Sequence, residues 1–231
     1  MKIRKLMNIW KAVAENKSFV HPLDKPLLPE PNDCFPLLRR VPEPWTGDPT
    51  KASIFHLTSH PRHGPNDGNQ DEKDREFWWS TMASTADSKD WEDHTSEDEL
   101  NWSKKNYGKF LEDPRFIPNL CNLRLVAYPC SSMRDMDSIS KDAAHTLHTT
   151  KRMRAFVHRQ LVPAAREGKC LLLVMKAPGD WGFANPEFGD SKEDRWDKGL
   201  FISRSGLQHS PITPGSRVGP AIQKWLDSLP A

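Results

Sequence analysis

Residues able to bind a ligand or act on it gather in four segments, each of which follows a short apolar run. These segments are residues 58–67, 128–135, 177–181 and 208–217. They supply histidine, serine, arginine and tyrosine side chains, which can position a water molecule, donate to phosphate or stack on a base. An apolar run that opens into a polar loop is typical of a buried strand in an open α/β sheet. Because such sheets bind ligands at the carboxyl ends of their strands, the pattern predicts one site built from four loops.

The elements that position these loops follow from the hydrophobic pattern. Strands are predicted near residues 53–57, 122–127, 169–175 and 200–203. Helical spacing occurs near residues 3–13, 76–79, 100–111, 141–161 and 218–226. Continuous apolar strands that alternate with helices favour a parallel sheet covered on both faces. We therefore expect an α/β protein, a three-layer α/β/α arrangement with a short, mainly parallel four-stranded central sheet.

The chain has 231 residues, enough for one domain with a sizeable core and few for two. We expect a single domain over residues 1–231. Within it, residues 1–41 are predicted to form an N-terminal helix and a proline-rich strap. The hydrophilic section 65–115 is predicted to be helical, and its pattern leaves open whether it is a lid or a surface insert.

Charge and cysteine usage limit the class of protein. The net charge is only +2, but acids dominate residues 67–99 and are absent from residues 199–224. One face could thus meet a polyanion, and solvated helix faces explain the same pattern equally well. The four cysteines lack the close spacing of a zinc or iron–sulfur site, so we expect them to be reduced and mostly buried. No apolar segment approaches the roughly 20 residues of a membrane span, and we expect a soluble cytoplasmic monomer.

Four motifs occur in a recognisable order. They are residues 45–49 (Trp-Thr-Gly-Asp-Pro), His60-Pro61 after a strand, residues 128–132 (Tyr-Pro-Cys-Ser-Ser) and residues 209–215 (His-Ser-Pro-Ile-Thr-Pro-Gly). This order resembles the uracil-DNA glycosylase superfamily, especially its divergent prokaryotic members, over about residues 42–227. The resemblance implies a monofunctional DNA glycosylase without a metal or other cofactor, whose partner is DNA. Its substrate would be a flipped-out uracil or a bulky modified pyrimidine such as glucosylated hydroxymethylcytosine, and related enzymes that act on phage DNA suggest antiviral defence.

The resemblance also implies roles for individual residues. His60 stands where the superfamily carries an Asp or Asn that places the attacking water, and an imidazole can orient a water as well. A role in loop structure is an equal alternative for His60. Asp67 is the next catalytic candidate, and His209 is implied to stabilise the departing base anion.

Base and DNA contacts complete this set. The base-binding candidates are Tyr128, Ser131, Ser132 and Asn66. The DNA-binding candidates are Arg62, Arg134, Ser210, Ile212, Ser216 and Arg217, with Ile212 as a wedge into the base stack. A tyrosine at a strand end is also typical of ordinary core, so stacking and packing both remain open for Tyr128. The basic helix, with Lys151, Arg152, Arg154, Arg159 and Arg166, is either DNA-facing or simply solvated.

Two alternatives belong to other functional classes. The chain could bind nucleic acid without catalysis, if His60 has replaced the residue that positions the water. It could also be a metal-dependent hydrolase that uses His56, His60 and His63. Because residues 56 and 60 share a strand face only if the strand continues to Pro61, we expect no metal site.

Overall fold

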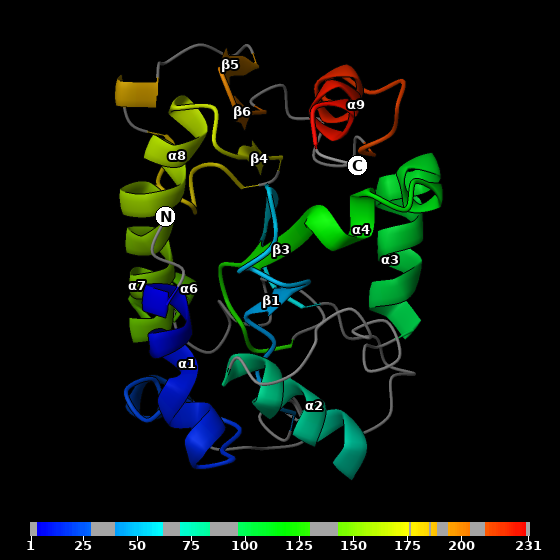
Figure 1. Cartoon of the computed structure of the whole chain (residues 1–231). Coiled ribbons are helices and arrows are strands. Elements are labelled where there is room, and N and C mark those ends of the chain that lie inside the picture. The colour runs from blue at the N-terminus through cyan, green and yellow to red at the C-terminus, as the bar shows by residue number, and fades with distance from the viewer. Residues whose placement is uncertain are drawn as a thin grey trace.

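A six-stranded, mostly parallel sheet forms the centre of the molecule (Figure 1). The computed structural model describes residues 4–28, 40–61, 70–83, 97–129, 143–175, 177–184, 186–188, 194–203 and 211–229. The strands are β1 (Trp45–Thr46), β2 (Ile54–Thr58), β3 (Leu120–Arg124), β4 (Leu171–Val174), β5 (Arg195–Asp197) and β6 (Leu200–Ile202). They lie in the order β1-β3-β2-β4-β6-β5.

The four inner strands β3, β2, β4 and β6 run parallel, whereas β1 and β5 pair antiparallel at the two edges. The α/β class and the mainly parallel sheet are therefore confirmed. The expected number of four strands is wrong, because the two edge strands add to the parallel four. Those edge strands contain only two and three residues, and neither includes the apolar run by which the inner strands were predicted.

Helices flank the sheet on both sides. The α-helices are α1 (Arg4–Glu15), α2 (Glu72–Met82), α3 (Glu97–Tyr107), α4 (Phe116–Asn119), α6 (Ala143–Thr146), α7 (His148–Phe156), α8 (Val162–Arg166) and α9 (Gly219–Asp227). The short 3-10 helices are η1 (Lys25–Leu27), η4 (Gly108–Glu112) and η6 (Pro186–Phe188), and the π-helical segment η5 (Val157–Leu161) joins α7 to α8. All five helical regions expected from the sequence are present.

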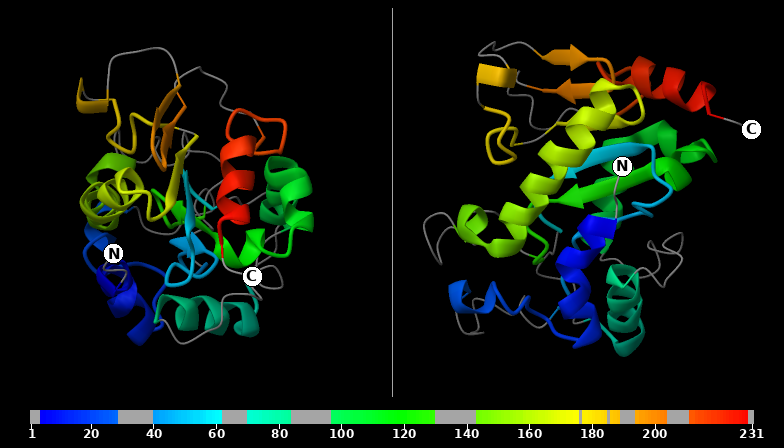
Figure 2. Two further views of the ribbon diagram at one scale, coloured as in Figure 1. Left: turned by 45° about the horizontal axis from the view of Figure 1, so that its top comes forward. Right: turned by 60° about the vertical axis from the view of Figure 1, so that its left-hand side comes forward.

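Each face of the sheet has its own apolar cluster. One cluster joins the sheet to α1, α2, α7 and α8, and the other joins it to α3, α4 and α9. The left view of Figure 2 shows the strands between these two groups of helices. The described parts of section 65–115 belong to these layers, since Trp78 of α2 and Trp102 of α3 are core residues.

The N-terminal helix α1 forms because its apolar residues Leu6, Ile9, Trp10 and Val13 repeat at helical spacing and are all buried. It packs against α2 and α7. The strap that follows is described only in part, since residues 29–39 lie outside the described ranges. Within those ranges no helix is long and apolar enough to cross a membrane.

Glycine at position 47 is required where β1 meets β3. Gly47 has φ +84°, and a Cβ there would lie 2.1 Å from the carbonyl oxygen of Leu120. No other residue fits so close to a neighbouring backbone. The Trp-Thr-Gly-Asp-Pro motif therefore has a structural task in this chain, because it brings the edge strand β1 against β3.

Candidate functional site

The carboxyl ends of β2 and β4 lie at the point where the strand order reverses. From β2 the chain leads to β3 on one side of β2, and then crosses to β4 on the other side. Open α/β sheets bind ligands at such a topological switch point. Thr58 ends β2 here, and residues 59–61 leave the sheet directly from it. For residues 58–61, the described part of the predicted 58–67 loop, the position at the carboxyl edge of a parallel sheet is confirmed.

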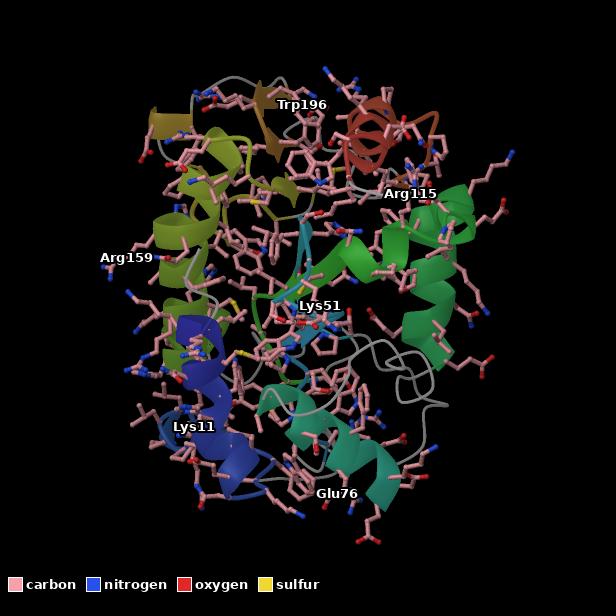
Figure 3. All side chains as sticks on the ribbon, in the orientation of Figure 1. Lys11, Lys51, Glu76, Arg115, Arg159 and Trp196 are labelled. Atoms are coloured by element: carbon pink, nitrogen blue, oxygen red, sulfur yellow. The ribbon has the colours of Figure 1, made fainter. Side chains whose placement is uncertain are left out.

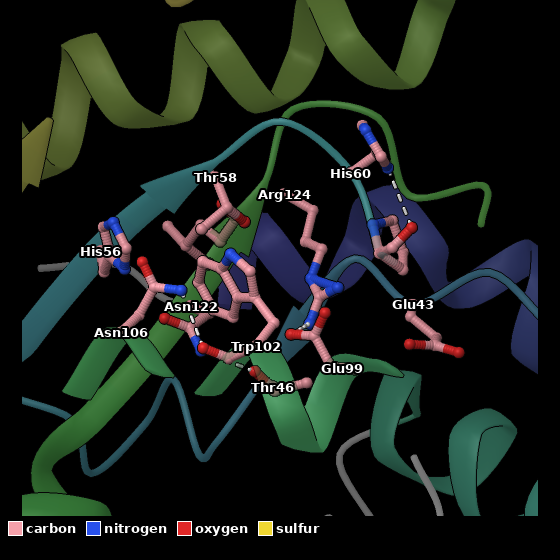
Figure 4. A network of polar contacts seen from close by, with 12 residues as sticks. Glu43, Thr46, His56, Thr58, His60, Glu99, Trp102, Asn106, Asn122 and Arg124 are labelled. Atoms are coloured by element: carbon pink, nitrogen blue, oxygen red, sulfur yellow. Dashed lines mark hydrogen bonds and ion pairs between the residues drawn. The ribbon is translucent and has the colours of Figure 1, made fainter. Parts of the chain in front are cut away.

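His60 lies in this loop and is half-buried. Its Nδ1 lies 2.9 Å from the carbonyl oxygen of Pro61, as the dashed line in Figure 4 shows. A carbonyl oxygen only accepts hydrogen bonds, so Nδ1 must carry the proton. In the neutral ring the lone pair is then on Nε2, which is a hydrogen-bond acceptor. The contact with Pro61 thus selects the tautomer that can take a proton from water.

Beside this loop, the sheet face that looks toward α3 is polar. His56 of β2 stands opposite Asn122 of β3, and Thr58 stands opposite Arg124. Alternate residues of a strand share a face, so these four side chains point to the same side (Figure 4). The amino ends of the same strands are apolar on this face. Polarity therefore increases toward the carboxyl edge, where the His60 loop begins.

Tyr107 of α3 connects the first two of these residues. His56 Nδ1 lies 2.8 Å from the Tyr107 hydroxyl, which in turn donates to Oδ1 of Asn122. Nδ2 of Asn122 donates to Oγ1 of Thr46 at 3.0 Å. Burial raises the pKa of Tyr107 well above its ordinary value, so the hydroxyl keeps its proton. This chain of bonds fixes α3 against three strands.

Arg124 and Glu99 form a buried ion pair at the carboxyl end of β3. Nη2 of Arg124 donates to Oε1 of Glu99 at 2.8 Å, and the two side chains are 1% and 3% exposed. The Nε and Nη1 donors of Arg124 have no hydrogen-bond partner in the described part of the chain. Removing two charges from water is costly, and their attraction offsets that cost only while both are present.

Tyr128, a base-stacking candidate, lies in the interior. It is 1% exposed, its hydroxyl donates to Oδ2 of Asp24 at 2.8 Å, and it accepts from the backbone N–H of His21 at 3.1 Å. Its ring meets Trp10 edge-to-face with centroids 6.1 Å apart. Burial, followed by the nearby Asp24 carboxylate, raises the pKa of Tyr128 well above its ordinary value. No face of the ring is open to a base in this arrangement, which fits the core interpretation.

Three DNA-binding candidates near the C-terminus are engaged within the protein. Ile212 is 1% exposed and belongs to the cluster under α9, so it does not project as a wedge in this arrangement. Ser216 Oγ donates to the carbonyl oxygen of Thr213 at 2.7 Å and closes a turn before α9. Arg217 pairs with Asp194 at 2.6 Å, but its side chain is 63% exposed and remains accessible to a phosphate.

The other candidates fall outside the described residues. They are Arg62, Asn66, Asp67, Ser131, Ser132, Arg134, His209 and Ser210. Their predicted roles stay predictions. Of the full set, the described structure places only His60 at the switch point.

The three-histidine metal site lacks geometric support. His56 is buried and bound to Tyr107, whereas His60 lies beyond the strand end, about 13 Å further along an extended chain. His63 is outside the described residues. Among the residues that the structure describes, no group of three potential ligands could hold a metal ion.

Sequence reasoning missed the buried polar residues of this edge. Arg124, Glu99 and Glu43 are each no more than 3% exposed, although such residues are rarely buried. The sequence did carry a signal for Arg124. Asn122 and Arg124 alternate with apolar residues inside a strand whose other residues have the pattern of a fully buried strand. That alternation indicates a buried polar face.

Comparisons with protein-family models, with curated proteins and with solved structures find no match to this chain. The functional argument therefore depends on the geometry of the carboxyl edge and on the four sequence motifs.

Proposed function

We propose that this protein is a monofunctional DNA glycosylase that hydrolyses the N-glycosidic bond of a flipped-out abnormal or modified base. The observation that carries the proposal is the position of His60. It follows β2 at the switch point, and its Nδ1 contact with Pro61 leaves the lone pair on Nε2. The motif resemblance puts a water-positioning residue at this same position.

Hydrolysis of the N-glycosidic bond requires a water molecule and a general base near C1′ of the sugar. A base inside a duplex must first be flipped out, because its glycosidic bond is otherwise inaccessible. The water oxygen then bonds to C1′ while the C1′–N bond breaks and its electron pair leaves with the base. Nε2 of His60 takes the proton that the water loses. By resemblance, His209 stabilises the base anion until a proton reaches it.

The tautomer that the Pro61 contact selects suits this role, because Nε2 of the neutral ring is a hydrogen-bond acceptor. The buried polar face beside the loop adds fixed dipoles and the Arg124–Glu99 ion pair within a water-poor region, where electrostatic effects are stronger than in water. These groups support a site that binds a polar, charged transition state.

The proposed substrate is uracil or a bulky modified pyrimidine such as glucosylated hydroxymethylcytosine, and the proposed setting is antiviral defence. The direct test is incubation of the purified protein with duplexes that contain uracil, hypoxanthine, hydroxymethylcytosine or its glucosylated form, in the presence of a chelator. Alkali then converts any abasic site into a strand break. We expect breaks with one substrate class and none with unmodified DNA.

The same assay separates the alternatives. A protein that binds nucleic acid without catalysis would shift the duplexes in a salt-dependent way and leave no alkali-labile site. A metal-dependent hydrolase would lose activity to the chelator. Strand breaks that form in the presence of the chelator, and only in a modified duplex, favour the glycosylase over both alternatives.

A further inference from the structure

Helices α1 and α7 lie side by side on one flank of the molecule (Figures 1 and 2). Together with η1 and η5 they expose six cations that have no carboxylate partner in the described part of the chain. These cations are Arg4, Lys5, Lys25, Lys151, Arg152 and Arg159. We call this set the α1–α7 surface. Figure 3 places Lys11 and Arg159 on the same flank.

The charge of this flank is one-sided. Residues 4–28 contain five Lys or Arg and two acids, and residues 148–161 contain four Lys or Arg and no acid. Of the two acids, Asp24 is fully buried and Glu15 is paired with Lys11 at 3.3 Å. Within these two ranges the cations therefore meet little competition from carboxylates.

The cations extend along both helical segments. Arg152 of α7 and Arg159 of the π-helical η5 are seven residues apart in one continuous helical segment. On α1, Arg4 and Lys5 are exposed in the first turn, and the exposed Lys11 further along is paired with Glu15. Neighbouring helix axes are typically 8–10 Å apart. Cations spread along two neighbouring helical segments suit a linear polyanion better than a single small anion.

Buried contacts fix the segment that follows α1 against α7. Asp24, just before η1, accepts from the backbone N–H of Thr149 at 3.2 Å and from its hydroxyl at 2.5 Å. The His21 and His148 rings stack with centroids 5.9 Å apart. The cations are thus arranged on a rigid support before a ligand arrives, which lowers the entropy lost on binding.

This flank is connected to the loop that holds His60. The backbone N–H of Val126 donates to the carbonyl oxygen of Ser59 at 2.9 Å, directly before His60. One residue earlier, the carbonyl oxygen of Leu125 accepts from Oγ1 of Thr150 in the first turn of α7 at 3.1 Å. A polyanion on the first turns of α7 therefore lies beside the carboxyl edge of the sheet.

A nucleic acid fits this surface better than a membrane does. The apolar row of α1 faces the core, whereas a helix that lies in a membrane interface turns its apolar face outward. The large exposed apolar side chains described on this flank are limited to Leu23 and Leu27 beside the cations. Phosphate groups need only cations, which the α1–α7 surface supplies.

We infer that the α1–α7 surface binds the phosphate backbone of duplex DNA outside the catalytic site and holds the duplex beside the His60 loop. The choice of DNA rests on the proposed function. The surface itself is tested without any excisable base. Binding of an unmodified duplex is measured at several salt concentrations between about 50 and 200 mM, and log K is plotted against log[salt].

The informative variant is Lys151→Ala/Arg152→Ala. Each cation that neutralises a phosphate adds about 0.9 to the magnitude of the salt slope, so removing two such cations should lower it by about 2. Arg4→Ala/Lys5→Ala should act in the same direction. The matched control is Lys104→Ala/Lys105→Ala, a neighbouring pair of exposed lysines on α3 across the sheet, which should leave the slope unchanged.

An unchanged slope in Lys151→Ala/Arg152→Ala, or an equal fall in the α3 control, overturns the inference. So does binding to phosphatidylserine vesicles with none to the duplex. The test separates this inference from the proposed function. If the α7 variant lowers the slope while no modified base is ever excised, only the glycosylase proposal fails. If the protein excises a base and the slope is unaffected, only the α1–α7 surface fails.

Discussion

The carboxylate of Glu99 lies 2.8 Å from Nη2 of Arg124, and both side chains are almost completely buried. Removing one member of such a pair leaves an uncompensated charge in the interior. We therefore expect Glu99→Ala to lower the free energy of unfolding by about 3–5 kcal/mol, as measured by urea denaturation.

The double variant Glu99→Leu/Arg124→Met is the matched comparison, because it removes both charges and keeps the volume similar. It should recover most of the stability lost in Glu99→Ala. A loss below about 1 kcal/mol in the single variant would mean that water reaches the pair.

The Asp24 carboxylate fastens the N-terminal segment to α7. It accepts from Tyr128 and from two groups of Thr149, so Asp24→Ala leaves three donors without this acceptor. We expect Asp24→Ala to lower the free energy of unfolding by roughly 3 kcal/mol and to speed amide exchange in both α1 and α7. Tyr128→Phe removes one of these three bonds to Asp24 and the bond that the hydroxyl accepts from the His21 N–H, and should cost about 2 kcal/mol. Equal losses in the two variants would contradict the central place of the carboxylate.

Stability should fall in acid because of His21. Burial lowers the pKa of His21, with His148 and Arg152 acting in the same direction and Asp24 opposing them. Below about pH 6.5 the unfolded chain binds a proton at this histidine that the folded protein binds only at lower pH. The free energy of unfolding therefore decreases as pH falls through this range.

His21→Gln should flatten that decrease, which urea titrations at about pH 7.5 and about pH 5.5 will measure. The comparison is made as the difference between the two pH values within each protein, since the substitution also changes stability at neutral pH. The same pH dependence in His21→Gln and in the original chain would assign the effect to another group.

Cys121 and Cys170 are buried free thiols. Burial raises the pKa of Cys170 to about 12 and that of Cys121 well above its ordinary value. Only the thiolate reacts with iodoacetamide, so neither should be alkylated in the folded protein and both should react in urea. Peptide mass spectrometry distinguishes them from Cys34 and Cys130. Rapid labelling of Cys121 under native conditions would show that the core opens readily.

Much of the fold was predictable because the four parallel strands are the apolar runs of the sequence. The edge strands were not, since Trp45–Thr46 and Arg195–Asp197 are defined by pairing with a neighbour rather than by their own pattern. Local sequence indicates burial on average, and pairing at an edge depends on distant segments.

The site was only partly predictable for the same reason. A tyrosine after a strand suits base stacking and core packing equally, and what decides for Tyr128 is Asp24, 104 residues away in the sequence. The place of His60 was predictable, because it follows directly from the end of β2.

The measurement that tests the central claim most directly is single-turnover base excision by His60 variants. The substrate is the duplex from which the original chain excises a base. We expect His60→Ala to lose at least about 100-fold in rate, since general base catalysis contributes roughly that much or more. Duplex binding and the unfolding midpoint should be retained. His60→Asn keeps a hydrogen-bond acceptor for water and should excise faster than His60→Ala. Excision by His60→Ala at the original rate would contradict the account.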